Sequence, residues 1–306
     1  MSVSEPSTAA TLDAAPVIDD TFAEAFPMTA TRLVITAVDH ELAATAAREF
    51  CGNASSVIGC DAEAGIECPV GPDETPDGRP GVSVLAFAFN RKSLEKAVTA
   101  RVGQNVLTCP TTACFSGLVG ESKEERIKVG ANLRFFGDGF QISKRLGDRR
   151  YWRIPVMDGE FLCDDVFGTV KGIGGGNLIV CGRSPAGTLA AMRSAVSDIA
   201  AIPDVILPFP AGIVRSGSKV GSKYAALRAS TNHAFCPTLR GQVESGLADD
   251  EAVVYELVID GLSESAVAAA MKTGLQRLSS CPDIVRVTAG NYGGKLGPHH
   301  FHLHRL

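Results

Sequence analysis

The sequence lacks the features that would place it at once among disulfide-rich, zinc-binding or membrane proteins. Its nine cysteines are odd in number and include no C-x-x-C pair, so neither a complete disulfide framework nor a thiolate zinc site is indicated. No apolar run approaches the roughly 20 residues that a membrane-spanning helix needs. We therefore predict a cytoplasmic globular protein in which most cysteines are small buried hydrophobic residues.

An excess of charge of one sign is also missing. The chain carries 29 Lys and Arg against 34 Asp and Glu, which gives a formal net charge of −5. Such a balance leaves no broad electrostatic footprint, so we expect neither nucleic acid nor a membrane surface as a partner. The N-terminus has no basic segment followed by an apolar one, which excludes a secretory signal. Residues 1–18 read instead as a polar, mobile tail.

What the chain does contain is an internal repeat. The segments that start at Arg32 and at Asn177 match at an offset of about 145 residues, and each reads as strand, helix, strand. Their helices are expected to begin after Asp39 and Ser184, because short polar side chains cap helix N-termini.

A second pair of segments follows the same pattern. Residues 82–108 and 253–290 again read as strand, helix, strand, and they align when Ser93 and Ser263 are taken as the caps. Two such units per half give the split β-α-β arrangement. The predicted fold is therefore α+β, with two similar ferredoxin-like α/β sandwich lobes whose sheets are mainly antiparallel. We place the lobes at residues 19–150 and 151–306.

The junction between the lobes and two long connections stand outside the repeat. Residues 128–176 hold short apolar runs broken by glycine, which predict hairpin strands added at the junction. The connections at 68–81 and 231–251 are rich in turn-forming residues and too long for simple linkers. Connections of that length are often functional.

Several short motifs suggest chemistry that their context does not support. The glycine run at 171–177 precedes a strand, so a close backbone approach or a turn explains it better than a nucleotide site. The strings S-G-S-K (216–219), S-T-N (230–232) and K-T-G (272–274) reproduce the signatures of penicillin-binding serine acyl-enzymes, with Ser216 as nucleophile and Lys219 beside it. K-T-G falls inside a helical pattern, however, so this reading is kept only as an alternative.

One carboxylate has an unusual predicted environment. In the strand VVYELVI, Glu256 shares a face with Val254 and Val258, and the repeat alignment puts Ala86 at the same place in the first lobe. Apolar neighbours disfavour the charged form, which raises a carboxyl pKa toward the range a general acid or base needs. The alternative is a glutamate at a strand end that meets an arginine.

Four of the six histidines lie in the last eight residues. His300, His302 and His304 alternate with Phe301 and Leu303, so the imidazoles are expected on one face of a strand. Three imidazoles could bind zinc, but no further ligand pattern accompanies them. A closing strand with a polar outer face is the preferred reading, and the interruption of the tract excludes an affinity tag.

Six longer strings together resemble one family, the formylmethanofuran:tetrahydromethanopterin formyltransferases of methanogenic archaea and methylotrophic bacteria. The similarity runs from about Asp19 to the C-terminus. The strings are DDTFAEAF (19–26), ETPDGRPG (74–81), FFGDGF (135–140), FPAGIVRSGSKVGSKY (209–224), ASTNHAFCPT (229–238) and AGNYGGKLGPHHFHLH (289–304).

The resemblance implies a homotetrameric transferase without a tightly bound cofactor or metal. It would move a formyl group between methanofuran and N5 of tetrahydromethanopterin, the two carriers acting as cosubstrates. The modest charge suggests a bacterial version whose methanofuran analogue has a glutamate-rich tail. Such an enzyme would run in the direction of formaldehyde oxidation, in a complex with subunits that hydrolyse the formylated carrier. A non-catalytic scaffold subunit of that complex is the other alternative.

The resemblance assigns a role to one residue, and the chemistry of the two carriers suggests roles for others. Glu256 matches the glutamate that tunes protonation at N5 of the pterin. Hydroxyl and ammonium groups in the glycine-punctuated segment 216–224 are suited to the oxyanion and to acidic tails, although solvated lysines are an equal reading. An aromatic wall could hold the pterin, although core packing explains Phe136 equally well. The candidate substrate-binding residues are Ser218, Lys219, Ser222, Lys223, Phe136, Asp138, Asn232, Asn291 and Lys295.

Overall fold

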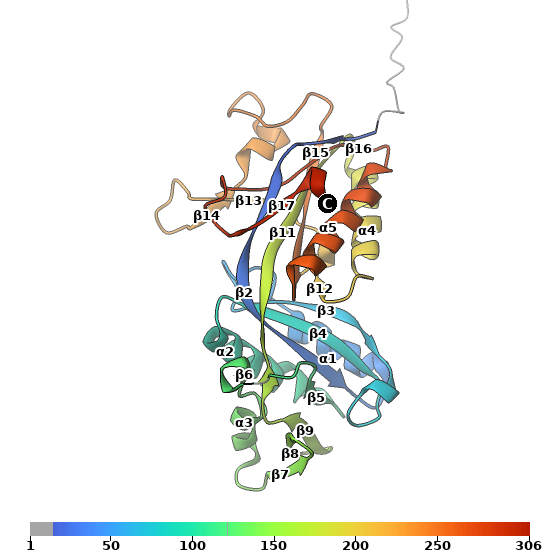
Figure 1. The fold of residues 1–306 in the computed structure, drawn as a ribbon, viewed down its shortest axis with the longest axis vertical. Coiled ribbons are helices and arrows are strands. Elements are labelled where there is room, and N and C mark those ends of the chain that lie inside the picture. The colour runs from blue at the N-terminus through green and yellow to red at the C-terminus, as the bar shows by residue number, and fades with distance from the viewer. Residues whose placement is uncertain (1–14, 121) are drawn as a thin grey trace, which may run out of the picture.

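The computed structural model describes residues 15–120 and 122–306. Two long strands, β2 (Phe22–Thr36) and β11 (Val170–Gly182), run antiparallel along the length of the molecule (Figure 1). They pair with each other over Ala30–Phe26 and Val170–Gly174, and each continues beyond this region into a different lobe. The resulting sheet has 13 strands in the described part of the chain and is mainly antiparallel.

The first lobe is built on the C-terminal part of β2. Its strand order is β3-β4-β2-β5, and two helices connect the strands in the β-α-β manner. This is the ferredoxin-like order that the repeat predicted. The elements are α1 (His40–Cys51), β3 (Glu63–Val70), β4 (Gly81–Ala88), α2 (Arg91–Arg101) and β5 (Ala113–Ser116).

The second lobe repeats this arrangement on the C-terminal part of β11. Its strand order is β12-β15-β11-β16, again with two connecting helices, which confirms the predicted fold class. Its further elements are α4 (Pro185–Ile199), β12 (Val205–Ile206), β15 (Val253–Gly261), α5 (Glu264–Ser279) and β16 (Ile284–Thr288).

The helix caps confirm one repeat alignment and correct the other. Asp39 and Ser184 cap α1 and α4 as predicted. Ser263 caps α5, but α2 begins three residues earlier than expected, because Asn90 accepts a hydrogen bond from the backbone N–H of Ser93. Asn90 is therefore the counterpart of Ser263.

This shift also changes the counterpart of Glu256. Glu256 pairs with Ile179 on β11, and Ser83 pairs with Val34, which matches Ile179 in the first repeat. The first-lobe counterpart of Glu256 is therefore Ser83, and the expectation of Ala86 was wrong. The error arose because Asn and Ser are equally good caps, so the sequence alone offered two registers.

Each lobe has its own apolar core beneath its helices, and a third cluster joins the two. On β4, Val84 and Ala86 face the helices of the first lobe, whereas Leu85 and Phe87 face the opposite way and pack with Met28 in the joining cluster. The helix-free faces of the two sheets therefore meet at the junction of the lobes. The lobe boundary between residues 150 and 151 remains a prediction. The start of β2, which that boundary assigns to the first lobe, packs in the core of the second lobe.

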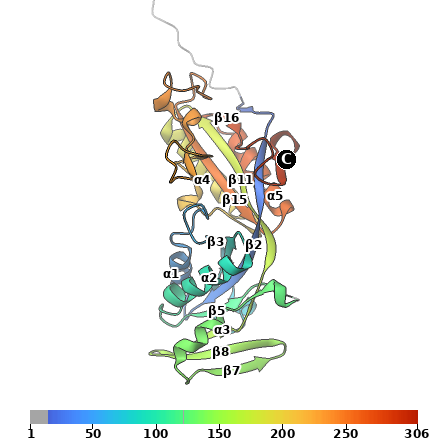
Figure 2. The same cartoon turned by 90° about the vertical axis from the view of Figure 1, so that its left-hand side faces the viewer.

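The junction segment is hairpin-like only in part. Strands β7 (Ile142–Leu146), β8 (Arg149–Val156) and β9 (Gly159–Asp164) form the expected hairpins at one end of the molecule (Figure 2). The string ANLRFFGDGF forms α3 (Gly130–Leu133) and a 3-10 turn, where a strand was expected. Gly130 lies against the backbone of Asp164 too closely for a side chain, and Ala131 N–H donates to Asp165, so the segment is held as a helical turn.

The glycine run 171–177 lies inside β11, where close packing explains it. A Cβ atom at Gly174 would stand 2.3 Å from the Met28 sulfur, and one at Gly176 would stand 2.5 Å from Val267. The expectation of a close backbone approach is therefore correct, whereas the expectation that the run precedes a strand is not.

The two ends of the chain meet in the second lobe. Residues 1–14 of the expected tail lie outside the described residues, but Val17–Ile18 form β1, which pairs with β16, so strand pairing begins before Asp19. At the other end, β17 (His299–His302) pairs with the start of β2, and Phe301 and Leu303 are buried. The closing strand is confirmed, except that it ends at His302 and His304 lies in a short 3-10 helix. None of the described helices is long and apolar enough to cross a bilayer.

Candidate active site

A cavity of about 560 Å³ opens on the helix-free face of the second-lobe sheet, close to the junction. This volume suits a small ligand. Its floor comes from β11 and β15, and its rim comes from the start of β2 and from loops far apart in the sequence. The residues that line it include Glu24, Val57, Glu63, Gly175, Asn177, Ser216, Ser218, Lys219, Asn232, Phe235, Glu256, Asn291 and Tyr292.

Glu256 projects from β15 into this cavity. Its strand neighbours Leu257 and Ile259 are buried on the other face with α4 and α5, as strand alternation requires. Among the residues that the structure describes, none donates a hydrogen bond to its carboxylate or forms an ion pair with it. Burial alone raises the pKa of Glu256 to about 7. The carboxyl group is therefore desolvated, as the strand pattern predicted, and among the described residues it forms no ion pair with an arginine, which the alternative required.

The segment after Val214 is fastened beside Glu256. Val214 and Glu256 exchange backbone hydrogen bonds of 2.8 and 3.0 Å, so the chain leaves this bridge directly over the carboxyl group. Gly217 lies close to it: a Cβ atom there would be 3.6 Å from the Glu256 carboxylate. Strand β13 (Ser218–Val220) then pairs with β14 (Ala229–Thr231) and places Lys219 at the rim.

Glu24 is a cavity residue that the sequence did not reveal. It is 3% exposed, and its carboxylate accepts backbone N–H groups from Tyr292, Gly294, Leu296 and Gly297. Burial would raise the pKa of Glu24, but these four donors hold it below the ordinary value. The ionised carboxylate thus organises the loop 291–297. Glu24 lies in the string DDTFAEAF, but no pattern in the neighbouring sequence shows that its carboxylate will accept N–H groups about 270 residues away.

Two asparagines fix the same wall from other directions. The buried Asn177 side chain donates to Gly290 O at 3.2 Å and accepts from Gly290 N at 2.6 Å. The Asn291 amide donates to Thr21 Oγ1 at 3.0 Å and to Phe22 O at 3.2 Å. Asn291 was predicted to bind substrate, but the observed contacts of its amide hold β2 against the loop.

The structure brings five of the predicted site residues together and leaves five apart. Glu256, Ser218, Lys219, Asn232 and Asn291 line the cavity. Ser222 and Lys223 follow β13 in a loop beyond the rim, and Lys295 is exposed between two lining residues. Phe136 and Asp138 lie at the far end of the first lobe near α3, where Phe136 is 66% exposed, so they do not reach this cavity.

The geometry argues against a serine acyl-enzyme. Ser216 and Lys219 do share the cavity, but K-T-G lies inside α5 as its sequence pattern predicted. Gly274 packs against Ile199 of α4, where a Cβ atom would stand only 2.9 Å from that side chain. The third signature therefore lies on a helix that packs against the opposite face of the sheet from Ser216, with Gly274 buried and Lys272 exposed.

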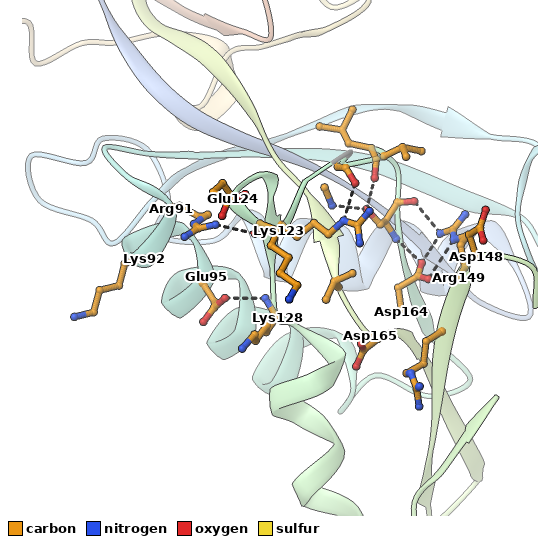
Figure 3. Close-up of a pocket in the computed structure, with 18 of the residues that line it drawn as sticks. Arg91, Lys92, Glu95, Lys123, Glu124, Lys128, Asp148, Arg149, Asp164 and Asp165 are labelled. Atoms are coloured by element: carbon orange, nitrogen blue, oxygen red, sulfur yellow. Dashed lines mark hydrogen bonds and ion pairs between the residues drawn. The ribbon is translucent and has the colours of Figure 1, made fainter. Parts of the chain in front are cut away.

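A larger groove in the first lobe has a different character (Figure 3). It measures about 1130 Å³ and contains none of the predicted site residues. Eight basic side chains line it, and Arg149 pairs with Asp164, whose pKa burial raises. The buried carboxylate of this groove, Asp164, is thus paired with a cation, unlike Glu256. We therefore assign the candidate active site to the second-lobe cavity.

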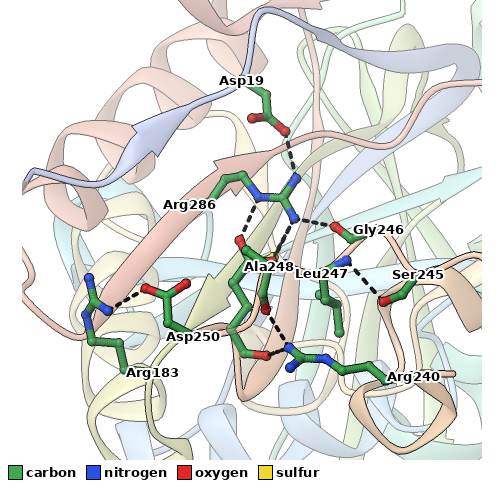
Figure 4. A network of polar contacts seen from close by, with 11 residues as sticks. Asp19, Arg183, Arg240, Ser245, Gly246, Leu247, Ala248, Asp250 and Arg286 are labelled. Atoms are coloured by element: carbon green, nitrogen blue, oxygen red, sulfur yellow. Dashed lines mark hydrogen bonds and ion pairs between the residues drawn. The ribbon is translucent and has the colours of Figure 1, made fainter.

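An arginine network supports the outer wall of that cavity (Figure 4). Arg286 on β16 donates to Glu251 at 2.6 Å, to Asp19 at 3.0 Å and to the Gly246 carbonyl at 2.6 Å. Its guanidinium lies 6.0 Å from the ring of Phe235, which lines the cavity. The network therefore ties the long connection 231–251 to the sheet.

Comparisons with known proteins place the whole chain. The family described as Formylmethanofuran-tetrahydromethanopterin formyltransferase matches residues 14–156, and the one described as FTR, proximal lobe, matches residues 159–306. The protein of the first name from Methylococcus capsulatus is 55% identical over 292 residues, which cover 94% of this chain and 97% of the relative. A subunit of the formyltransferase/hydrolase complex from Methylorubrum extorquens is 52% identical over 298 residues, covering 94% and 95%.

Solved structures agree with this placement. The formyltransferase/hydrolase complex of Methylorubrum extorquens contains a chain that is 51% identical, with a TM-score of 0.90 over 94% of this chain and 96% of that one. The formyltransferase of Methanosarcina barkeri is 45% identical, with a TM-score of 0.88 over 95% and 98%. The chain therefore belongs to the formylmethanofuran:tetrahydromethanopterin formyltransferase family.

Proposed function

We propose that the cavity around Glu256 is the place where this formyltransferase moves a formyl group between a methanofuran-type carrier and N5 of tetrahydromethanopterin. The observation that carries the proposal is the Glu256 carboxyl group. It faces a ligand-sized cavity, it forms no ion pair among the described residues, and burial raises its pKa to about 7. Such a group can both accept and donate a proton near neutral pH.

The reaction needs no nucleophile from the protein. With both carriers bound side by side, N5 attacks the formyl carbon, and the N5–C bond forms while the carbonyl oxygen takes up negative charge. Glu256 accepts the proton of N5 and delivers it to the nitrogen of the leaving amine. The bond between that nitrogen and the formyl carbon then breaks, and the carboxylate returns to its starting state.

Polar groups at the rim serve charge stabilisation and carrier binding. Ser216, Ser218 and Asn232 line the same cavity as Glu256, so we assign them to the developing oxyanion. Lys219 is half-buried at the rim, where its ammonium suits carboxylates on the carrier tails.

The assembly of the protein is part of the proposal. We infer that it works as a homotetramer in the cytoplasm, without a tightly bound cofactor, and in contact with formyl-carrier hydrolase subunits. The relative from Methylorubrum extorquens supports the last point, because it is named as one subunit of such a complex and the structure of that complex holds methylofuran. We expect the reaction to serve formaldehyde oxidation in a bacterium.

The test is an ultraviolet assay for N5-formyl pterin with purified protein, a formylated methanofuran-type carrier and tetrahydromethanopterin. The proposal expects turnover by the isolated protein. Absence of turnover with either carrier, together with binding of hydrolase subunits, would favour a scaffold subunit. Covalent labelling of Ser216 by a β-lactam, abolished by Ser216→Ala together with the activity, would revive the serine acyl-enzyme.

A further inference from the structure

Two carboxyl groups from different lobes meet at the edge of the candidate active site. Glu63 begins β3 in the first lobe and is 4% exposed, and Asp260 lies near the end of β15 in the second lobe and is 0% exposed. The two carboxyl groups lie close enough for each to shift the pKa of the other as a side-chain hydrogen-bonding partner. Asp260 lies four residues beyond Glu256 on the same face of β15, so the pair belongs to the surface that carries the proton-handling carboxyl group.

Each member of the pair holds a different wall of the cavity. Glu63 Oε1 accepts the backbone N–H of Val57 at 2.9 Å, and Val57 belongs to the lining loop 56–59. Asp260 Oδ1 accepts the backbone N–H of Gly175 at 3.0 Å. Gly175 has a φ of +89° and lies where the pairing of β11 with β15 is interrupted, so this contact supplies its N–H group with a partner that the ladder does not. The pair therefore connects the loop 56–59 of the first lobe to the point in the second lobe where β11 departs from its regular pairing with β15.

The contact between the two carboxyl groups requires a proton. Asp260 Oδ2 is buried, and within residues 15–120 and 122–306 no N–H or hydroxyl group donates to it. Two ionised carboxylates in contact in a buried place repel each other strongly, whereas one shared proton converts the contact into a hydrogen bond. Burial raises the pKa of Asp260 well above its ordinary value, and burial also raises the pKa of Glu63.

No cation compensates this pair within the described part of the chain. Glu63 and Asp260 shift each other's pKa, and the other polar groups that act on them are the Val57 and Gly175 N–H groups. The titratable groups that face the cavity from the neighbouring elements are Glu24, Lys219, Glu256 and Tyr292.

We propose that Glu63 and Asp260 share one proton and act as positioning residues that clasp the two cavity walls in the shape that binds the pterin. The inference rests on the proposed function of the cavity. The clasp touches neither the formyl carbon nor N5, so it governs KM for the pterin and leaves kcat to Glu256. The shared proton is present at low pH and is lost as pH rises through the folded-state pKa. Loss of the proton places two anions in contact and loosens both walls.

The first experiment measures KM for tetrahydromethanopterin between pH 6.5 and 9.5 in three proteins. In the wild type, KM should rise roughly tenfold toward alkaline pH, as expected when a buried hydrogen bond is lost. In Asp260→Asn, the side-chain oxygen can still accept from Gly175 and the NH₂ group can still donate to Glu63, so KM should stay low and flat. In Glu63→Ala the clasp is absent, so KM should be high at every pH while kcat stays within about twofold.

The second experiment does not depend on activity. Hydrogen exchange of peptides that contain Val57 and Gly175, corrected for the intrinsic pH effect, should accelerate in Glu63→Ala and in the wild type at alkaline pH, but not in Asp260→Asn. If the protein formylates nothing while this exchange pattern holds, the proposed function fails and the clasp stands. If KM and exchange are independent of pH in the wild type, or if Asp260→Asn behaves like Glu63→Ala, the clasp is refuted. Glu63→Leu, which fills a similar space but offers no hydrogen-bonding group, provides the same comparison should the alanine variant not fold.

Discussion

Replacing Glu256 by glutamine should slow formyl transfer and at the same time stabilise the fold at alkaline pH. The rate should fall roughly 100-fold, the lower end of what loss of a general acid or base costs. The gain in stability follows from the burial of the carboxyl group without a partner. A charge that is costly in the folded state is removed, while the amide keeps the size of the side chain.

The magnitude can be worked from the pKa. An ordinary glutamate has a pKa of 4.5, whereas burial raises that of Glu256 to about 7. At about 1.4 kcal/mol per pH unit, the folded protein loses about 3 kcal/mol between pH 4.5 and 7, because the unfolded chain releases this proton first. The variant has no proton to lose. Its advantage in unfolding free energy should therefore grow from near zero below pH 4.5 to about 3 kcal/mol at pH 8, with water in the cavity making this an upper value.

Urea denaturation at pH 5 and pH 8, alongside the ultraviolet assay, tests both effects. Glu160→Gln is a suitable control, because Glu160 is exposed on the β9 hairpin and should change neither rate nor stability appreciably. A variant that gains no stability between pH 5 and pH 8 would show that the carboxyl group is not desolvated. A variant with an unchanged rate would exclude Glu256 as the proton carrier.

Three further changes probe the walls of the cavity. Glu24→Gln should lower the unfolding free energy by about 1–3 kcal/mol at neutral pH, because four N–H groups lose an ionised acceptor. The pKa of Glu24 in the folded protein is held below 4.5, so the wild type should lose this contribution only as the pH falls through that folded-state pKa. Urea denaturation at a series of pH values measures both effects. Lys219→Met should raise KM for a carrier with an acidic tail about tenfold, as expected for loss of a charge-assisted contact, whereas Lys223→Met should leave it nearly unchanged. Arg286→Met should cost about 3–5 kcal/mol, because the fully buried Glu251 carboxylate loses its partner, and should speed proteolysis within 240–251.

The sequence predicted the fold well because its signals are local and occur twice. Strand and helix periods and the caps Asp39, Ser184 and Ser263 are all readable along the chain. The register of the second repeat was misread where two capping residues lie three positions apart. The helical turn at Gly130 was also missed, because the close approach of Asp164 that fixes it comes from another strand.

The candidate site was predictable only where one strand decides the environment. Alternation along β15 was enough to place Glu256 in an apolar face. The roles of Glu24, Glu63 and Asp260 depend on contacts between segments that are distant in the sequence, and no local pattern reports them. The polar strings around Lys223 and Lys295 resemble the lining segments in composition, but the turns between them direct these side chains to solvent.

The two long strands have a mechanical consequence. Strands β2 and β11 are hydrogen-bonded to each other, and each continues into both lobes. The pair therefore resists bending of one lobe against the other. Many enzymes enclose two substrates by hinged closure of their lobes. In this protein such a closure would have to bend both strands or break the hydrogen bonds between them. We therefore expect admission and release of the carriers to depend on movement of the rim segments 215–252 and 289–298 instead of whole lobes.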